Sequence, residues 1–319
     1  ALALEISVDS LALAAIGLGG HVFDRRRFPG TWRDQSPSET IQHLADLAQP
    51  MVAALPARTR IVGIGCGVAG VTRRSDGFLH LAPNLGWADL PLREMLVTCF
   101  RGAAPVLVAN EADLGAFGEY RRGSAPGVEH LVYLSGGVGI GVGVVIEGRV
   151  LLGMAGYAGE AGHTVVNPGG IKCRCGSVGC WETEAGEPAL LRRLGGDVSG
   201  EEVPIQAIAD LAAAGDKAAL DAMSTVGHWL GIGIANMVNM FNPEAVLLGG
   251  LYEPLYGFLE NSLRAAVRAN ALAAAAAVVT IGPSALGQDA PLIGAAEMIF
   301  SRFLSDPAGN ARLAPAQLV

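Results

Sequence analysis

Alternating apolar and polar residues divide the chain into two stretches with a similar order of elements. The first stretch predicts three short strands, a helix and a strand, followed by a helix, a strand and a helix. The expected strands are 2–9, 11–18, 21–29, 60–65 and 105–110, and the expected helices are 37–55, 91–101 and 111–122. Ser36 is a candidate N-cap for the first helix, with Pro37 at its first position and Glu39 three residues after the cap.

The second stretch repeats this order in outline. Three strand-like runs are expected within 130–153, helices at 183–194, 204–241, 255–270 and 290–304, and strands at 245–248 and 278–282. Meandering strands followed by alternating helix and strand indicate a mixed sheet. The sequence therefore predicts a two-lobed α/β protein. The N-terminal lobe would cover 1–119, with the helix 290–306 packing back on it, and the C-terminal lobe would cover 120–289.

Composition narrows the class of protein. Of the 319 residues, 51% are hydrophobic, which is ample for a core, and the net charge of −8 argues against a nucleic-acid-binding surface on this chain. We find neither a membrane-spanning stretch nor a signal peptide, so we expect a cytoplasmic protein. The chain begins without Met, directly in a strand pattern, which suggests a piece of a longer protein.

Three of the five cysteines lie close together, at Cys173, Cys175 and Cys180, with His163 ten positions before the first of them. One imidazole and three thiolates form a tetrahedral ligand set that Zn2+ prefers. Disulfides or buried free thiols are the alternatives, but Cys173 and Cys175 are too close in sequence to pair comfortably. We therefore predict a structural zinc knuckle over 163–180, and we expect the isolated Cys66 and Cys99 to be core residues.

Several motifs together resemble the ROK family of repressors, open reading frames and sugar kinases, over essentially the whole chain. They are Gly65 with Ala69-Gly70, residues 82–87 (APNLGW), 109–112 (ANEA) with Gly118-Glu119, 135–143 (SGGVGIGVG), 159–163 (GEAGH), the cysteines with Trp181-Glu182, and 239–244 (NMFNPE) with 247–250 (LLGG). The resemblance implies the actin-like, ribonuclease-H-like ATPase fold, with a mixed sheet in each lobe.

The resemblance also implies a sugar site. Its residues would be Asn84, Asn110, Glu111, Glu160, His163 and Glu182. Carboxylates, amides and an imidazole suit sugar hydroxyls, which both donate and accept hydrogen bonds. A zinc ion on one ring nitrogen of His163 would leave the other for a hydroxyl. The plainer alternatives are surface charge or helix capping for the carboxylates, and turn formation for Asn84.

Two departures from the family's kinases bear on activity. The kinases carry an Asp-x-Gly-Gly-Thr turn that approaches the phosphates of ATP, whereas we align Asp9–Leu13 (DSLAL) with that turn. The kinases' catalytic Asp is replaced by Glu111, whose extra methylene misplaces the carboxylate. Both changes predict a sensor that binds a sugar without phosphorylating it.

We therefore interpret the chain as the sugar-effector-binding and dimerisation region of a ROK transcriptional regulator, resembling the xylose-repressor branch. It would form a homodimer or higher homo-oligomer and meet DNA only through an N-terminal winged helix, which these residues do not contain. An ATP-dependent sugar kinase remains the alternative, supported by the glycines of 136–143 and 249–250. A zinc-stabilised scaffold that binds no sugar is the third interpretation.

Overall fold

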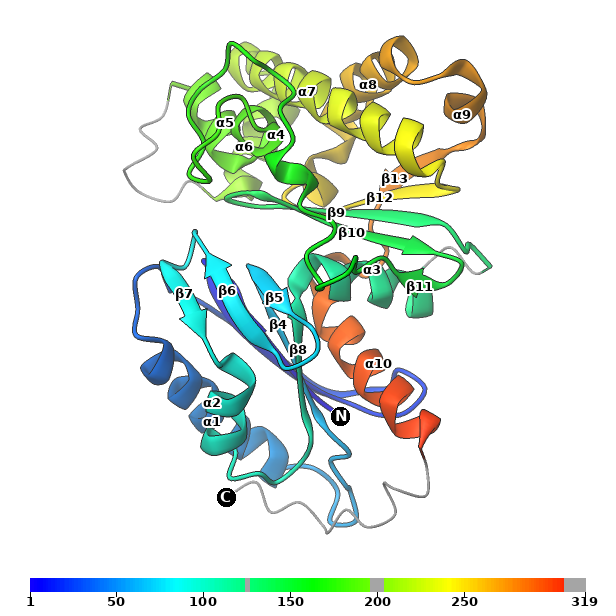
Figure 1. Cartoon of the computed structure of the whole chain (residues 1–319). Coiled ribbons are helices and arrows are strands. Elements are labelled where there is room, and N and C mark those ends of the chain that lie inside the picture. The colour runs from blue at the N-terminus through cyan, green and yellow to red at the C-terminus, as the bar shows by residue number, and fades with distance from the viewer. Residues whose placement is uncertain (124–126, 196–203, 307–319) are drawn as a thin grey trace. The chain divides into compact units, whose positions relative to one another are not determined.

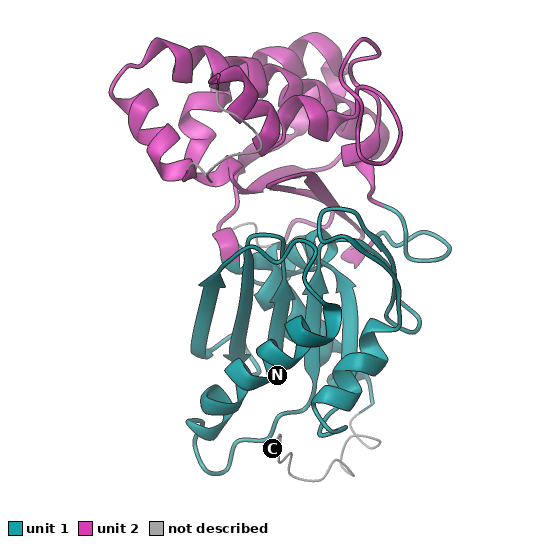
Figure 2. Ribbon diagram, turned by 90° about the vertical axis from the view of Figure 1, so that its left-hand side faces the viewer, with its two compact units in different colours: residues 1–123, 151–158, 289–319 teal, residues 124–150, 159–288 magenta. Residues whose placement is uncertain are grey.

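The chain forms two compact units. The structure is a computed structural model that describes residues 1–123, 127–195 and 204–306. Unit 1 comprises 1–123, 151–158 and the segment from 289 onward, and unit 2 comprises 124–150 and 159–288 (Figure 2). None of the helices in the described part of the chain has the length and apolarity needed to cross a bilayer.

Unit 1 is built on a mixed five-stranded sheet of order β3-β2-β1-β4-β8. The strands are β1 Leu2–Ile6, β2 Ser10–Ile16, β3 Val22–Pro29, β4 Ile64–Val68 and β8 Val106–Asn110. Strands β1, β2 and β3 are antiparallel neighbours, whereas β1, β4 and β8 run parallel. The expected strand at 60–65 thus begins later, at Ile64.

Helices cover both faces of this sheet because its strand residues alternate between two cores (Figure 1). Leu2, Leu4 and Ile6 face α1 (Pro37–Ala53) and α2 (Leu92–Cys99). Ala3 faces α3 (Glu111–Arg122) and α10 (Ala290–Ser305). A Cβ added at Gly65 of β4 would lie 2.4 Å from the carbonyl oxygen of Ala295, so small residues let α10 approach the sheet closely.

A small antiparallel sheet, β5-β6-β7, completes unit 1. Its strands are β5 Val71–Arg73, β6 Phe78–Ala82 and β7 Trp87–Leu90. The sequence pattern predicted only turns here, because strands of three to five residues give little alternation. Cys66 is fully buried in β4, as predicted, while Cys99 at the end of α2 is only half-buried.

Unit 2 repeats the sheet topology of unit 1. Its order is β11-β10-β9-β12-β13, again with antiparallel pairs at one edge and parallel pairs at the other. The strands are β9 Leu131–Gly136, β10 Ile140–Ile146, β11 Arg149–Val150, β12 Ala245–Gly250 and β13 Thr280–Pro283. The repeated pattern along the sequence therefore corresponds to two sheets of one design.

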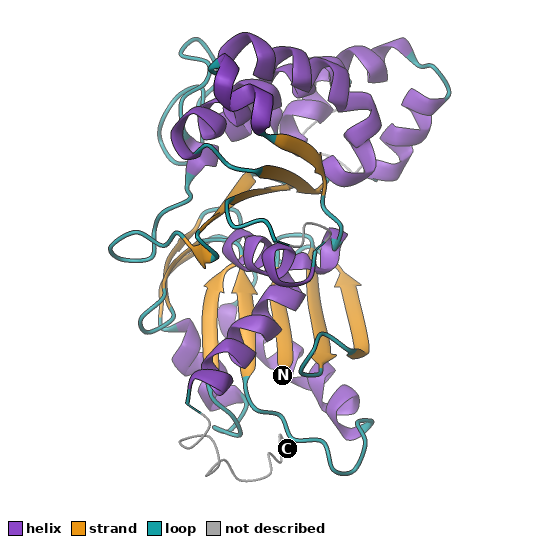
Figure 3. Cartoon of the chain, turned by 90° about the vertical axis from the view of Figure 1, so that its right-hand side faces the viewer, coloured by secondary structure: helices purple, strands orange, loops and turns teal. Residues whose placement is uncertain are grey.

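The helices of unit 2 gather beside this sheet (Figure 3). They are α4 Trp181–Ala185, α5 Glu187–Arg193, α6 Ile205–Ala213, α7 Lys217–Phe241, α8 Tyr252–Asn270 and α9 Ala273–Val278, with a 3-10 turn η1 at Ala161–His163. The helix expected at 183–194 is two helices broken at Gly186. The stretch expected at 204–241 is also two helices, α6 and α7. Asp216 caps the second of them, because its side chain accepts a hydrogen bond from Ala219 N.

Candidate functional site

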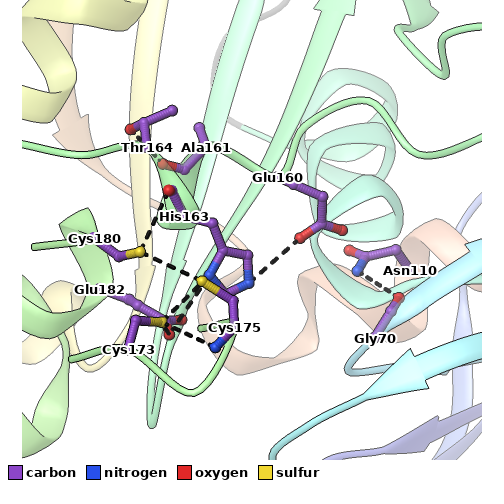
Figure 4. Close-up of polar contacts among 10 residues, drawn as sticks. All are labelled: Gly70, Asn110, Glu160, Ala161, His163, Thr164, Cys173, Cys175, Cys180 and Glu182. Atoms are coloured by element: carbon purple, nitrogen blue, oxygen red, sulfur yellow. Dashed lines mark hydrogen bonds and ion pairs between the residues drawn. The ribbon is translucent and has the colours of Figure 1, made fainter. Parts of the chain in front are cut away.

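Four side chains from the loop before α4 converge in unit 2. The ligand atoms of His163, Cys173, Cys175 and Cys180 all lie within 4.8 Å of one another (Figure 4). His163 Nδ1 is 3.7 Å from Cys173 Sγ, and the sulfurs of Cys175 and Cys180 are 3.6 Å apart. The predicted ligands therefore come together as one cluster.

This cluster fits a tetrahedral metal ion better than a disulfide. Two sulfurs bound at about 2.3 Å to tetrahedral Zn2+ lie roughly 3.8 Å apart, whereas disulfide sulfurs lie about 2.05 Å apart. The observed 3.6 Å between Cys175 and Cys180 matches the first arrangement. Burial raises the pKa of the Cys173 and Cys180 thiols, which favours their protonated forms. Because a metal ion binds the thiolate, a bound cation would have to displace these protons.

The backbone around the cysteines is tightly folded. Gly179 has φ +72°, and a Cβ there would overlap the carbonyl oxygen of Asn167. Its own carbonyl oxygen accepts bonds from the backbone N–H groups of Val166 and Asn167. Glu184, a buried residue that the sequence did not single out, accepts bonds from the Asn167 amide at 2.9 Å and from Arg193 at 3.0 Å. The loop is therefore tied to α4 and α5.

Trp181 fixes the end of this loop. Its side chain is fully buried, and its indole N–H donates to the carbonyl oxygen of Trp229 on α7 at 3.0 Å. Because Trp181 lies between Cys180 and Glu182 in sequence, its packing positions a metal-ligand candidate on one side and a carboxylate on the other.

His163 presents its two ring nitrogens to different groups. Nδ1 faces the cysteines, and Nε2 lies 4.0 Å from Glu160 Oε2. Burial raises the pKa of the Glu160 carboxyl. Glu182 lies closer to the cluster than expected, with Oε1 3.0 Å from Cys173 Sγ and 3.7 Å from His163 Nδ1. Unit 2 therefore brings together Glu160, His163 and Glu182 around the cysteines (Figure 4).

The remaining predicted residues belong to unit 1. Asn110 ends β8 and caps α3, because its Oδ1 accepts from Ala112 N at 2.7 Å and its Nδ2 donates to Gly70 O at 3.0 Å. Gly70 in turn packs against Ala82 at the end of β6, and Asn84 follows in the turn before β7. Asn110 is therefore the cap of α3, a role that the sequence suggests, among the site residues, only for the carboxylates.

The turn after β1 lies earlier than the sequence alignment indicated. It spans Ser7–Ser10, where Ser7 N donates to Ser10 O at 3.0 Å, and 11–13 are buried within β2. We aligned the phosphate-binding turn with Asp9–Leu13, but 10–13 of that stretch belong to β2. The turn itself, Ser7-Val8-Asp9-Ser10, contains no glycine.

Side chains of unit 1 occupy this turn. Ser7 Oγ donates to Glu111 Oε2 at 2.9 Å and lies 3.3 Å from Glu5 Oε1. Arg27 on β3 pairs with Glu5 Oε2 at 2.8 Å and donates to Ser10 Oγ at 2.9 Å. Glu5, Ser7 and Arg27 were not predicted from the sequence; the one available signal was the charged Glu5 inside the apolar run of β1.

Among the predicted sugar-binding residues, Glu111 has a strongly altered acidity. Burial, with a further contribution from the Glu5 charge, raises the pKa of its carboxyl to about 8. A carboxyl that holds its proton at neutral pH is a poor general base.

Comparisons with known proteins agree with this architecture. The sequence profile of the ROK family matches residues 1–302. The xylose repressor of Bacillus subtilis (strain 168) is 34% identical over 270 residues, which cover 84% of this chain and 69% of the repressor. The crystal structure of a ROK family transcriptional regulator, a homologue of the E. coli MLC protein, superposes with a TM-score of 0.79 at 28% identity, covering 94% of this chain and 77% of that one.

A kinase is nearly as similar in structure. The ROK family glucokinase from Streptomyces griseus, in complex with glucose and AMPPNP, gives a TM-score of 0.77 at 26% identity, covering 93% of this chain and 98% of that one. The fold is thus shared by regulators and by sugar kinases, and only the site residues can separate the two activities.

Proposed function

Because the chain belongs to the ROK family, we propose that it is the sugar-sensing part of a transcriptional regulator and that it does not phosphorylate its sugar. The family contains both regulators and kinases among the relatives of this chain. The choice between them therefore depends on the residues that a phosphoryl transfer would need.

The observation that carries the proposal is the turn Ser7–Ser10. Phosphate cradles depend on backbone N–H groups exposed by glycine, with a cation close by. Here the turn has no glycine, Ser7 bonds to Glu111, and the Arg27 guanidinium is engaged by Glu5 and Ser10. A triphosphate at this turn would face the carboxylates of Glu5 and Asp9. The guanidinium of Arg27, already engaged by Glu5 and Ser10, would not be available to neutralise its charge.

We assign effector binding to residues that carry hydroxyl-recognising groups in each unit. They are Asn84, Asn110 and Glu111 in unit 1, and Glu160, His163 and Glu182 in unit 2. The sugar would act by favouring one conformation of a homodimer. That conformation would in turn set the spacing of DNA-binding segments outside this chain.

We assign His163, Cys173, Cys175 and Cys180 to a structural Zn2+ ion. When bound, the ion would fix the tautomer and orientation of His163, so that Nε2, on the side of Glu160, is the nitrogen left for a sugar hydroxyl. Glu182 lies against the same cluster, and its orientation would depend on the ion as well.

Calorimetry with zinc-loaded protein and a panel of pentoses and hexoses tests the binding claim. Glu160→Gln should weaken affinity for the recognised sugar roughly 10- to 100-fold, as expected for a lost charged hydrogen bond. The matched control Glu253→Gln, at an exposed position on α8, should bind as the wild type does. Failure of every sugar to bind would leave only the scaffold interpretation.

A sugar kinase is the second candidate, favoured by the glycines between β9 and β10. Gly137 N donates to Gly139 O at 3.0 Å in this turn, which belongs to the glycine-rich run 135–143. A coupled assay with ATP, Mg2+ and the same sugars decides between the candidates, because sugar-dependent turnover above background would overturn the sensor proposal.

A further inference from the structure

The three cysteines of the cluster differ in their exposure to solvent. Cys173 and Cys180 are buried, at 3% and 0% exposure, whereas Cys175 is exposed. Cys175 lies in the turn 173–176, in which Gly176 N donates to Cys173 O at 3.0 Å. Oxidation of cysteine follows exposure and thiolate character, and a metal-bound sulfur is a thiolate. A small oxidant in solution therefore reaches Cys175 more readily than either of the other two.

The sulfur of Cys180 lies beside that of Cys175. The two sulfurs are 3.6 Å apart and must approach by about 1.5 Å to form a disulfide (Figure 4). Gly176, which follows Cys175, has φ +99°, and a Cβ there would meet nothing within 4 Å, so the backbone next to Cys175 has room to move. Gly179, which precedes Cys180, packs tightly against Asn167. Cys175 is therefore the member of the pair that moves.

The third cysteine has partners of its own. Cys173 N donates to Ser177 O at 2.8 Å, and Cys173 Sγ lies 3.0 Å from Glu182 Oε1. A disulfide between Cys173 and Cys175, only two positions apart in sequence, would be strained. Cys173 is therefore the cysteine that stays reduced when the other two are oxidised.

We propose that Cys175 and Cys180 form a disulfide when a peroxide reaches the cluster, and that this disulfide releases the zinc ion assigned to it. The thiolate sulfur of Cys175 attacks one oxygen of hydrogen peroxide, the O–O bond breaks, and a sulfenic acid and hydroxide form. The thiolate of Cys180 attacks the sulfenic sulfur, the S–S bond forms, and a second hydroxide leaves. Two electrons pass from the sulfurs to the peroxide, and two protons from solvent convert both hydroxides to water.

The disulfide changes the groups beside the cluster. It removes two of the four candidate ligands, so that His163 and Cys173 alone cannot complete a tetrahedral site. The ring of His163 then loses the ligand that fixes its tautomer and orientation. Sugar binding should weaken as a result. This clause on the sugar rests on the proposed function, whereas the disulfide does not.

Mass spectrometry of the full chain after digestion with trypsin identifies the pair. Trypsin cuts after Arg174 and Arg192, so one peptide, 175–192, contains both Cys175 and Cys180. The third cysteine falls in a different peptide. Treatment of the zinc-loaded chain with hydrogen peroxide should make peptide 175–192 lighter by two hydrogen atoms. One zinc ion per disulfide should be released to a chromogenic chelator, and a dithiol with added zinc should reverse both changes.

A cysteine outside the cluster provides the control. Cys99→Ser removes a half-buried thiol of α2 and should release zinc at the wild-type rate. Cys180→Ser should leave Cys175 as a sulfenic or sulfinic acid, and the peptide masses of the wild type decide the pair even if this variant folds poorly. A disulfide that includes Cys173, zinc release without a disulfide, or a zinc-loaded chain that stays reduced while glutathione in the same tube is fully oxidised would overturn the proposal.

The clause on the sugar has its own measurement. Calorimetry should show that the oxidised chain binds the recognised sugar about 10-fold more weakly, the equivalent of one net hydrogen bond. Treatment with a dithiol and zinc should restore the affinity. Equal affinity of the oxidised and reduced chains would overturn this clause. If no sugar binds even to the reduced, zinc-loaded chain, the proposed function fails, while the peptide masses still decide the disulfide.

Discussion

Replacing Gly233 by alanine tests whether the packing of Trp181 holds the cysteine loop against α7. A Cβ at Gly233 would lie 1.9 Å from Trp181 Cε2, whereas carbon atoms normally approach to about 3.5–4.0 Å. The indole is fully buried, and its N–H is bonded to Trp229, so it cannot rotate away without losing that bond. The helix and the ring must therefore move apart by more than an ångström.

The expected magnitude follows from two opposing effects. Overpacking of a core costs about 1–3 kcal/mol, and loss of the indole hydrogen bond adds about 1 kcal/mol. Alanine in a helix recovers about 0.5–1 kcal/mol relative to glycine. Gly233→Ala should therefore destabilise the protein by roughly 1–3 kcal/mol, a fall in Tm of about 3–10 °C.

Thermal unfolding followed by circular dichroism, with a matched helical glycine as control, separates the effects. Gly257 on α8 is exposed, and a Cβ there would meet nothing within 4 Å, so Gly257→Ala should raise Tm slightly. The cost of Gly233→Ala should shrink in a Trp181→Phe background, with a coupling of about 1 kcal/mol or more. A Gly233→Ala protein that melts at or above the wild-type Tm would refute the reasoning.

Three further predictions concern the metal and the buried acids. Cys175→Ser removes one metal-ligand candidate, and bound zinc per chain, measured by mass spectrometry after dialysis, should fall well below one. Glu184→Ala leaves half-buried Arg193 without its carboxylate partner and should lower stability by roughly 1–3 kcal/mol while speeding zinc release to a chromogenic chelator; unchanged release would contradict the bracing role. Folded Glu111 holds its proton up to about pH 8 but releases it near 4.5 when unfolded, so its contribution to stability is present below pH 4.5 and lost as pH rises through 8. The wild-type Tm should therefore fall more between pH 5 and 8.5 than that of Glu111→Gln.

The sequence predicted the cluster of His163 with the three cysteines well because its residues are local. His163 and Cys180 are 17 residues apart, and the loop between them folds by turns that glycine permits. Most strands and helices could also be predicted, because their apolar residues recur with the spacing of a strand or of a helix. The strand β4 could not, because both 61–63 and 64–68 are apolar, and the strand forms where Gly65 admits Ala295 of α10.

The network around Glu111 could not be predicted in the same way. Ser7 and Glu111 are 104 residues apart, and Arg27 and Glu5 are 22 apart. Their contacts depend on the pairing of β1 with β2 and β3 and on the placement of α3, which are tertiary facts. The alignment of the phosphate turn with Asp9–Leu13 failed for a related reason: the polar residues Asp9 and Ser10 suggested a turn start, whereas Ser10 already belongs to β2.

The helix α10 has a consequence for how the protein is made. Its residues Leu292 and Ala295 complete the core that covers Ala3 and Ala14 of the first two strands, yet they are translated almost 280 residues later. Unit 2 is synthesised in between, so its sheet can form on the ribosome while one face of the first sheet is covered by α3 without α10. Chains that stop before 290 would therefore expose that apolar face and depend on chaperones, whereas completion of the last helix closes the first unit.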